Sequence, residues 1–122
     1  MGAPPQRDER ACQVRDVLNR VGDKWSLNVI NELSGGIRRF SELRRGVSGI
    51  SQRMLTVTLR GLERDGLVRR EVHPTVPPRV DYELTDLGRT LQATVCQLMT
   101  WTISHVEDIH AARDAYDARQ GS

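Results

Sequence analysis

Residues 49–68 read GISQRMLTVTLRGLERDGLV, and this stretch decides the fold. Ser51 can accept a hydrogen bond from a free N–H of a first helical turn, so a helix is expected to begin there. Three leucines recur at helical spacing and share one face. They are Leu55, Leu59 and Leu62. Gly66 can adopt the positive φ angle that ends a helix, so the stretch predicts an amphipathic helix with its leucine face on a core.

The face opposite the leucines carries polar, short and arginine side chains. They are Arg53, Thr56, Val57, Arg60 and Arg64. Exposed side chains of these types can reach base edges and phosphates in the major groove of DNA. An ordinary surface helix would show the same two faces, so the segments on either side decide between the two interpretations.

The segments before this helix predict two further helices. Asp8 is expected to cap a helix over about residues 9–21, whereas residues 1–6 contain two prolines and should form an extended arm. Asp23 is expected to cap a strongly apolar second helix, which the Ser-Gly-Gly sequence at 34–36 ends.

A short helix and a turn directly precede the opening stretch. Ser41 is expected to cap a brief helix over 42–45, and residues 47–50 form the turn. The short helix, the turn and the longer helix together predict a helix-turn-helix over about 41–65.

A β-hairpin is predicted next. Residues 67–72 and 80–84 alternate as strands do, and the sequence between them, His73 to Arg79, contains three prolines that exclude a central strand. A hairpin directly after a helix-turn-helix is a β-wing, here over about 67–84. The fold class is therefore α+β and mainly α, a winged helix-turn-helix with a two-stranded wing.

A long last helix is expected to begin after Thr85 and to run to about residue 112, with 113–122 fraying. Its apolar side chains repeat in steps of three and four residues. They include Leu87, Leu91, Val95, Leu98, Met99 and Val106. Little of the chain is left to cover this stripe. The stripe can pack back on the first helix, or helices 9–21 and 85–112 can pair with a second copy of the chain. The two arrangements are compatible with each other.

Composition narrows the function. A chain of 122 residues predicts a single domain, and an aromatic fraction of 4% argues against binding of single strands by base stacking. Net charge is +2, but residues 35–80 carry ten arginines against four acidic residues, whereas 81–122 carry three basic residues against seven acidic ones. The basic segment coincides with the helix-turn-helix and wing, as a partner of DNA requires.

Several classes of function find no support. No apolar run could span a bilayer and no signal peptide is seen, so we expect a cytoplasmic protein without membrane contact. The histidines and cysteines lack metal-ligand spacing, which predicts no metal site. No Gly-rich phosphate loop, nucleophile elbow or acid–base set is present, so no enzyme and no cofactor are expected.

The chain resembles the HxlR-type transcriptional regulators, winged helix-turn-helix proteins related to MarR-type repressors. The resemblance covers about residues 12–101 and rests on several motifs in the family's order. They are GDKW at 22–25, RFSEL at 39–43, GISQRML at 49–55, LRGLERDGLVRR at 59–70, PPRVDYELTDLG at 77–88, and Trp101. Two departures are Gln13, where the family usually has proline after its cysteine, and Gly61 inside the long helix of the helix-turn-helix.

The resemblance implies a homodimer on double-stranded DNA with a palindromic operator, one recognition helix in each half-site. It implies that the start and outer face of that helix read bases. These residues are Ser51, Gln52, Arg53, Thr56, Val57 and Arg60. It implies contacts to phosphates or from the wing by Lys24, Arg39, Ser41, Arg44, His73 and Arg79. For the arginines, phosphate contact alone stays an alternative to base contact.

Two cysteines suggest a switch. Some members of the resembling family sense oxidants or electrophiles through an N-terminal cysteine. Cys12, near the expected helix start and between Arg10 and Arg15, has an environment that favours a thiolate, whereas Cys96 is expected to be a buried packing residue. If the terminal helices cross in a dimer, the two could form an intersubunit disulfide. The alternative is a pair of structural thiols.

Two other interpretations stay open. A small-molecule effector could bind in a pocket lined by Trp25, Met99 and Trp101. A winged helix can also dock other proteins without contacting DNA, and salt-dependent binding to duplex DNA separates that protein-interaction module from a regulator.

Overall fold

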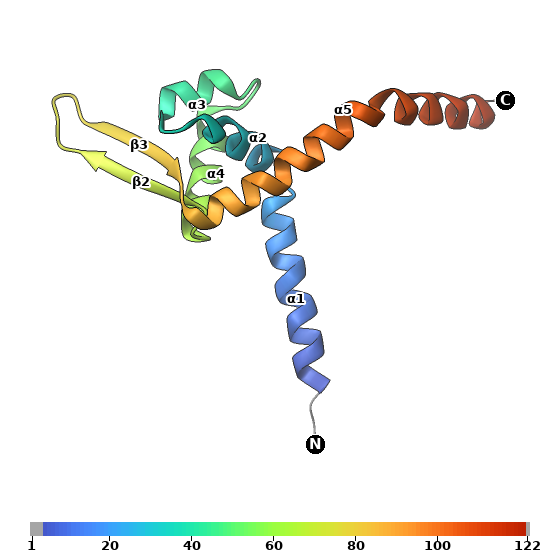
Figure 1. Ribbon diagram of the computed structural model, residues 1–122, viewed down its shortest axis with the longest axis horizontal. Coiled ribbons are helices and arrows are strands. Elements are labelled where there is room, and N and C mark those ends of the chain that lie inside the picture. Colours follow the sequence, from blue (N-terminus) through green and yellow to red (C-terminus); the bar gives the residue numbers. More distant parts are fainter. Residues whose placement is uncertain (1–3, 122) are drawn as a thin grey trace.

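Five α-helices and a three-stranded antiparallel sheet form the computed structural model, which describes residues 4–121 and the side chains of residues 9–121 (Figure 1). The helices are α1 (Pro4–Val21), α2 (Lys24–Glu32), α3 (Phe40–Gly46), α4 (Gln52–Arg64) and α5 (Asp86–Gln120). The strands are β1 (Arg38–Arg39), β2 (Val68–His73) and β3 (Arg79–Leu84), and a 3-10 turn, η1 (Leu33–Gly35), follows α2. The fold is the predicted winged helix-turn-helix, with α3 and α4 as its two helices and β2–β3 as its wing.

The core lies where α2, α3, α4 and the base of the sheet meet. Its buried side chains come from each of these elements. They include Val29, Ile30, Leu43, Leu55, Leu59, Leu62, Val68 and Leu84. From α5 only Val95 belongs to the buried hydrophobic residues, and residues 9–21 of α1 contribute none. The terminal helices are therefore attached to the core over a small part of their length.

The sheet has the strand order β1-β3-β2. β2 and β3 pair from Val68 with Leu84 at the base of the wing to His73 with Arg79 near its tip. β1 was not predicted as a strand. Its two residues pair with Tyr82 and Asp81 on the free edge of β3, which ties the start of the helix-turn-helix to the wing.

Three predicted helix caps are confirmed. Asp23 accepts the backbone N–H groups of Trp25 and Ser26, Ser51 accepts that of Met54, and Thr85 accepts that of Gly88. The predicted cap at Ser41 is wrong.

The short helix α3 begins two residues earlier than its predicted start. The Glu42 carboxylate accepts the Arg39 backbone N–H at 2.8 Å, so Arg39 stands at the cap and Ser41 lies within the first turn.

The start of α1 also differs from the prediction. Pro4 and Pro5 lie in its first turn, where their missing N–H groups would have had no helical partner, so they start the helix and do not hold an arm extended. Asp8 lies within the helix and is not its cap. Residues 1–3 of the predicted arm lie outside the described part.

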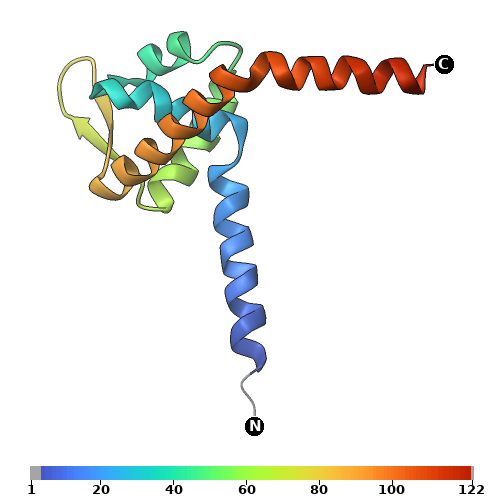
Figure 2. The same cartoon turned by 45° about the vertical axis from the view of Figure 1, so that its right-hand side comes forward.

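α5 continues as a helix to Gln120, so the prediction that residues beyond 112 fray is wrong up to that point. α1 and α5 leave the core in different directions (Figures 1 and 2), so α5 does not pack back along α1. Both helices keep apolar side chains exposed. They include Val14, Val17 and Leu18 on α1, and Leu98, Trp101 and Ile103 on α5. Within the described residues, no helix is both long and apolar enough to cross a membrane.

Candidate nucleic-acid interface

α4 presents the predicted two faces. Its buried residues are Leu55, Thr58, Leu59, Gly61 and Leu62. Its exposed residues include Gln52, Arg53, Val57 and Arg60. Thr56 is half-buried, and its hydroxyl donates to the Gln52 carbonyl at 2.9 Å, so it offers a methyl group and oxygen lone pairs to a ligand. The Ser51 hydroxyl accepts the Met54 N–H at 3.1 Å as the cap.

The arginines of this face are unpaired. Among residues 9–121, neither Arg53 nor Arg60 forms an ion pair. Unpaired guanidinium groups on an exposed helix face are available to phosphates and to the acceptor edge of guanine.

α4 is held against α1 through Gly61. A Cβ atom at Gly61 would lie 2.2 Å from a guanidinium nitrogen of Arg20, whose Nε in turn lies 3.1 Å from the Asp65 carboxylate. Arg20 of α1 thus lies across the glycine and reaches the end of α4. Sequence reasoning noted Gly61 only as an exception, because nothing local marks Arg20 as its neighbour.

A groove joins the helix-turn-helix to the wing. It has a volume of about 590 Å³ and is lined by the start of α3 and by the wing loop. Three predicted phosphate or wing residues meet there. They are Arg39, Ser41 and Arg79. Arg44 is exposed farther along α3.

His73 and Arg79 have partners of their own. His73 Nε2 lies 3.0 Å from one Asp81 carboxylate oxygen, and Arg79 Nε lies 3.5 Å from the other. Both side chains were predicted to contact DNA, and in the structure both are directed to a carboxylate on the wing.

Lys24 does not join this group. Its ammonium lies 4.7 Å from the centre of the Trp25 ring, and its side chain lines a groove of about 280 Å³ between α2 and α5. The apolar lining of that groove includes Leu27, Val95, Leu98, Met99 and Ile103.

Only one of the three residues predicted to line an effector pocket, Met99, lines this groove. Met99 lines it, whereas Trp25 packs against the core and Trp101 stacks on His105 with ring centres 4.7 Å apart. The two tryptophans therefore do not face the same cavity as Met99.

Both cysteines are exposed. Cys12 lies more than two turns inside α1, because α1 begins at Pro4, so the expectation that it lies near the helix start is wrong. Cys96 was predicted to be buried, but the residue before it, Val95, faces the core and Cys96 points elsewhere around the helix.

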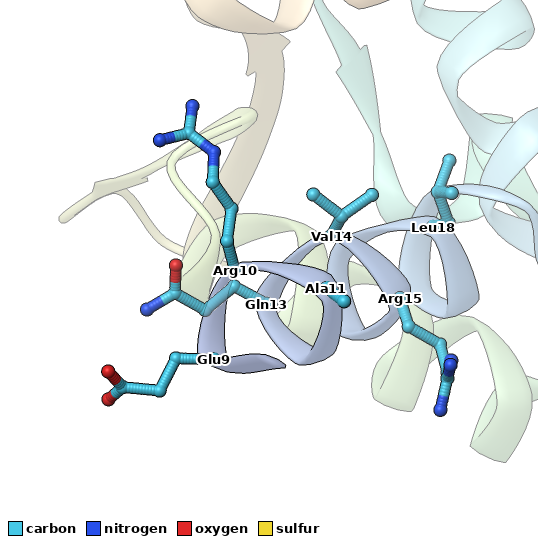
Figure 3. A pocket seen from close by; sticks show the side chains of 7 residues that line it. All are labelled: Glu9, Arg10, Ala11, Gln13, Val14, Arg15 and Leu18. Carbon is cyan, nitrogen blue, oxygen red and sulfur yellow. The ribbon is translucent and has the colours of Figure 1, made fainter. Parts of the chain in front are cut away.

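A hollow of about 890 Å³ lies along α1 and is lined by residues of that helix alone, among them Arg10, Val14 and Leu18 (Figure 3). Side chains of one helix cannot enclose a cavity, so this is an uncovered helix face. Among the described residues, no group of three or more His, Cys, Asp and Glu side chains could hold a metal ion.

Comparisons with known proteins extend these observations. Residues 20–110 match the family model described as HxlR-like helix-turn-helix. The chain is 41% identical over 113 residues to the HTH-type transcriptional regulator YdeP of Bacillus subtilis (strain 168), which covers 90% of this chain and 88% of that protein.

Two solved structures are similar in fold and in sequence. The transcriptional regulator ytfH from Salmonella typhimurium has a TM-score of 0.78 and 38% identity over 83% of this chain and 90% of that one. The redox regulator HypR in its reduced form has a TM-score of 0.75 and 42% identity over 81% and 98%.

Proposed function

Because the chain belongs to the HxlR-like helix-turn-helix family of transcriptional regulators, we propose that it binds a palindromic DNA operator as a homodimer. The family and its relatives are DNA-binding regulators and not enzymes. The observation that carries the proposal is α4, a capped helix that buries its leucines and exposes three arginines, Arg53, Arg60 and Arg64, without ion-pair partners among residues 9–121.

On this proposal α4 enters the major groove with its N-terminal end and outer face. The base-facing residues are Ser51, Gln52, Arg53, Thr56, Val57 and Arg60. The DNA phosphates are contacted by Arg39, at the cap of α3, and by Ser41 and Arg44 within that helix. Lys24 lines the α2–α5 groove, so it would contact DNA only if the DNA bends toward that groove.

The dimer rests on the terminal helices. α1 and α5 carry exposed apolar residues along faces that the described chain leaves uncovered, and a second copy is the partner that a palindrome requires. The two recognition helices of such a dimer must be about 34 Å apart, one turn of DNA.

Fluorescence anisotropy on a duplex from the upstream region of the gene tests the proposal. Wild-type protein should bind tightly, and the affinity should fall steeply as salt is raised. Arg53→Gln should weaken binding by about 1–3 kcal/mol if Arg53 pairs with a guanine. Arg113→Gln on distal α5 serves as the control, with no change expected. Equal affinity for a random duplex at every salt concentration would refute sequence-specific regulation and favour a protein-interaction module.

Redox control is a second proposal, favoured by the exposure of both cysteines and by the resemblance to HypR, which is solved in an oxidised and a reduced form. Peroxide would accept two electrons and two protons from Cys12 of one subunit and Cys96 of the other, giving one intersubunit disulfide and two waters. The cross-link would change the angle between the subunits and with it the distance between the recognition helices.

Non-reducing electrophoresis and anisotropy after peroxide treatment test the switch. Wild-type protein should form a covalent dimer and change its operator affinity, whereas Cys12→Ser and Cys96→Ser should do neither. A change in operator affinity that persists in Cys12→Ser would refute this disulfide. Unchanged operator affinity of the oxidised wild type would favour a small-molecule effector in the α2–α5 groove over redox control.

A further inference from the structure

The wing side of the crevice between α4 and the wing has no role in the proposed function so far. We propose that Arg70, on β2, forms a site with Arg60 of α4 that binds one backbone phosphate of duplex DNA. The inference rests on the proposed DNA binding, and it assigns a specific ligand group to a specific place on that surface.

The strand register divides the wing into two faces. On the inner face, Val68 lies opposite Leu84, Arg70 opposite Tyr82 and Val72 opposite Val80. Val68, Tyr82 and Leu84 are buried, so this face packs on the core at its base. Arg70 is the next inner residue of β2 after Val68, and it is exposed, where it lines a crevice beside α4.

The outer face of the wing is neutralised. It carries Arg69 opposite Glu83, Glu71 opposite Asp81 and His73 opposite Arg79. Arg69 pairs with Glu83, and both His73 and Arg79 lie against Asp81. Glu71 lies 3.8 Å from His73, and Arg89 of α5 lies 3.9 Å from Glu83. The acidic side chains of the wing strands all belong to this face.

The inner face keeps its positive charge. Arg70 faces Tyr82 across the ladder and has no carboxylate opposite. Among residues 9–121, neither Arg70 nor Arg60 forms an ion pair, and the Tyr82 hydroxyl has no hydrogen-bond partner. Two free guanidinium groups and a free hydroxyl on one surface suit an oxyanion.

These groups line one crevice of about 370 Å³ between α4 and the wing. Its lining is Thr56, Leu59, Arg60, Glu63, Arg70 and Tyr82. Thr56 and Arg60 also belong to the proposed base-facing surface of α4, so a strand of DNA lying along α4 would pass the mouth of the crevice. Glu63 is its single acidic group, and it leaves the lining with a net charge of +1.

The assignment changes the roles of two predicted residues. Arg60 contacts a phosphate together with Arg70 and does not read a base. Arg79 and His73 hold the wing through Asp81, and the cation that the wing contributes to the DNA contact is Arg70.

The test compares neighbouring arginines on opposite faces of β2. Operator and random duplexes are titrated at several salt concentrations with wild type, Arg70→Gln, Arg70→Lys and Arg69→Gln. Arg70→Gln should weaken binding to both duplexes about tenfold and lower the slope of log affinity against log salt by about 0.9, the value for one phosphate. Arg70→Lys should recover the slope, and Arg69→Gln should stay within about twofold of wild type.

A variant that is expected to strengthen DNA binding completes the test. Glu63→Gln removes the carboxylate from the crevice and should tighten binding about two- to threefold on either duplex. Circular dichroism melting of each variant shows whether it is folded.

The outcomes separate this inference from the proposed function. If wild type binds the operator but Arg70→Gln and Arg69→Gln have equal effects, the phosphate site is refuted and DNA binding stands. If Arg70→Gln weakens the operator complex but not the random one, Arg70 reads sequence and the phosphate assignment is wrong. If wild type binds no duplex, the proposed function itself fails.

Discussion

At the scale of single residues, Gly88 leaves less room for a side chain than any other glycine that the structure describes. A Cβ atom there would lie 2.0 Å from the backbone carbonyl oxygen of Leu67, and backbone cannot move aside as a side chain can. The sequence showed Gly88 only as a glycine early in a helix. Its role depends on a residue 21 positions earlier, which no local pattern reveals.

Gly88→Ala should therefore lower the free energy of unfolding by about 2–3 kcal/mol, measured by urea denaturation. Gly66→Ala is the matched comparison, because Gly66 has a φ of +77° with no atom within 4 Å of an added Cβ. It should cost only about 1 kcal/mol, the penalty of the left-handed conformation. A smaller loss in Gly88→Ala than in Gly66→Ala would contradict the steric argument.

Residue-scale predictions were correct where the cause was local. Asp23, Ser51 and Thr85 act as caps because an N-cap bonds to a backbone group two or three residues ahead. The prediction that Ser41 caps α3 was wrong because the Glu42 carboxylate accepts the backbone N–H of Arg39, so the helix begins earlier. The prediction that Cys96 is buried was wrong because the periodicity of α5 did not show which side of the helix meets the core.

At the scale of elements, the contact between α1 and α4 depends on one glycine. Arg20 reaches Asp65 only because Gly61 leaves room for its guanidinium group. An alanine at Gly61 would gain up to about 1 kcal/mol of helix propensity, and it would push aside the far end of a flexible side chain.

We expect Gly61→Ala to leave stability nearly unchanged while it breaks the Arg20–Asp65 ion pair. Asp65→Asn should cost less than about 1 kcal/mol in the wild-type background, since both partners are about one-third exposed, and nothing in the Gly61→Ala background. Urea denaturation of the four proteins in this cycle measures the coupling. Equal costs of Asp65→Asn in both backgrounds would show that the pair does not depend on Gly61.

The elements themselves were largely predictable from the sequence. α4, the wing strands and the long last helix follow from periodicity and turn residues. β1 was missed because two residues are too short for a pattern. The charge separation on the wing was also missed, since it follows from the register of β2 and β3 and not from either strand alone.

At the scale of the whole molecule, α1 and α5 are the least covered parts of the chain. The sequence predicted that the last helix has more apolar surface than one domain can cover, and the structure leaves Trp101 and Ile103 exposed. It did not predict that α1 and α5 diverge, because no pattern within a helix fixes its direction relative to another.

Val106→Asp should shift the protein from dimer to monomer in sedimentation equilibrium and weaken operator binding. Val106 lies on the apolar side of α5, beyond the part that touches the core, so a charge there opposes pairing without disturbing the fold. Ser104→Asp places the same charge on nearly the opposite side of the helix and should leave the dimer intact. Dissociation by both variants would argue against an interface along this stripe.

The junction at Gly88 also sets how motion passes through the molecule. The Thr85 hydroxyl donates to the Gly66 carbonyl, and the Thr85 N–H donates to the Leu67 carbonyl, so the end of α4, the start of β2 and the start of α5 meet at one joint. α5 extends about 50 Å from that joint. A tilt of about 5° moves its far end by about 4 Å, while atoms of α4 beside the joint move by a few tenths of an ångström. The long helix is thus a lever whose short arm ends beside the C-terminal end of α4, and a large displacement at its tip becomes a small one at that end of the helix.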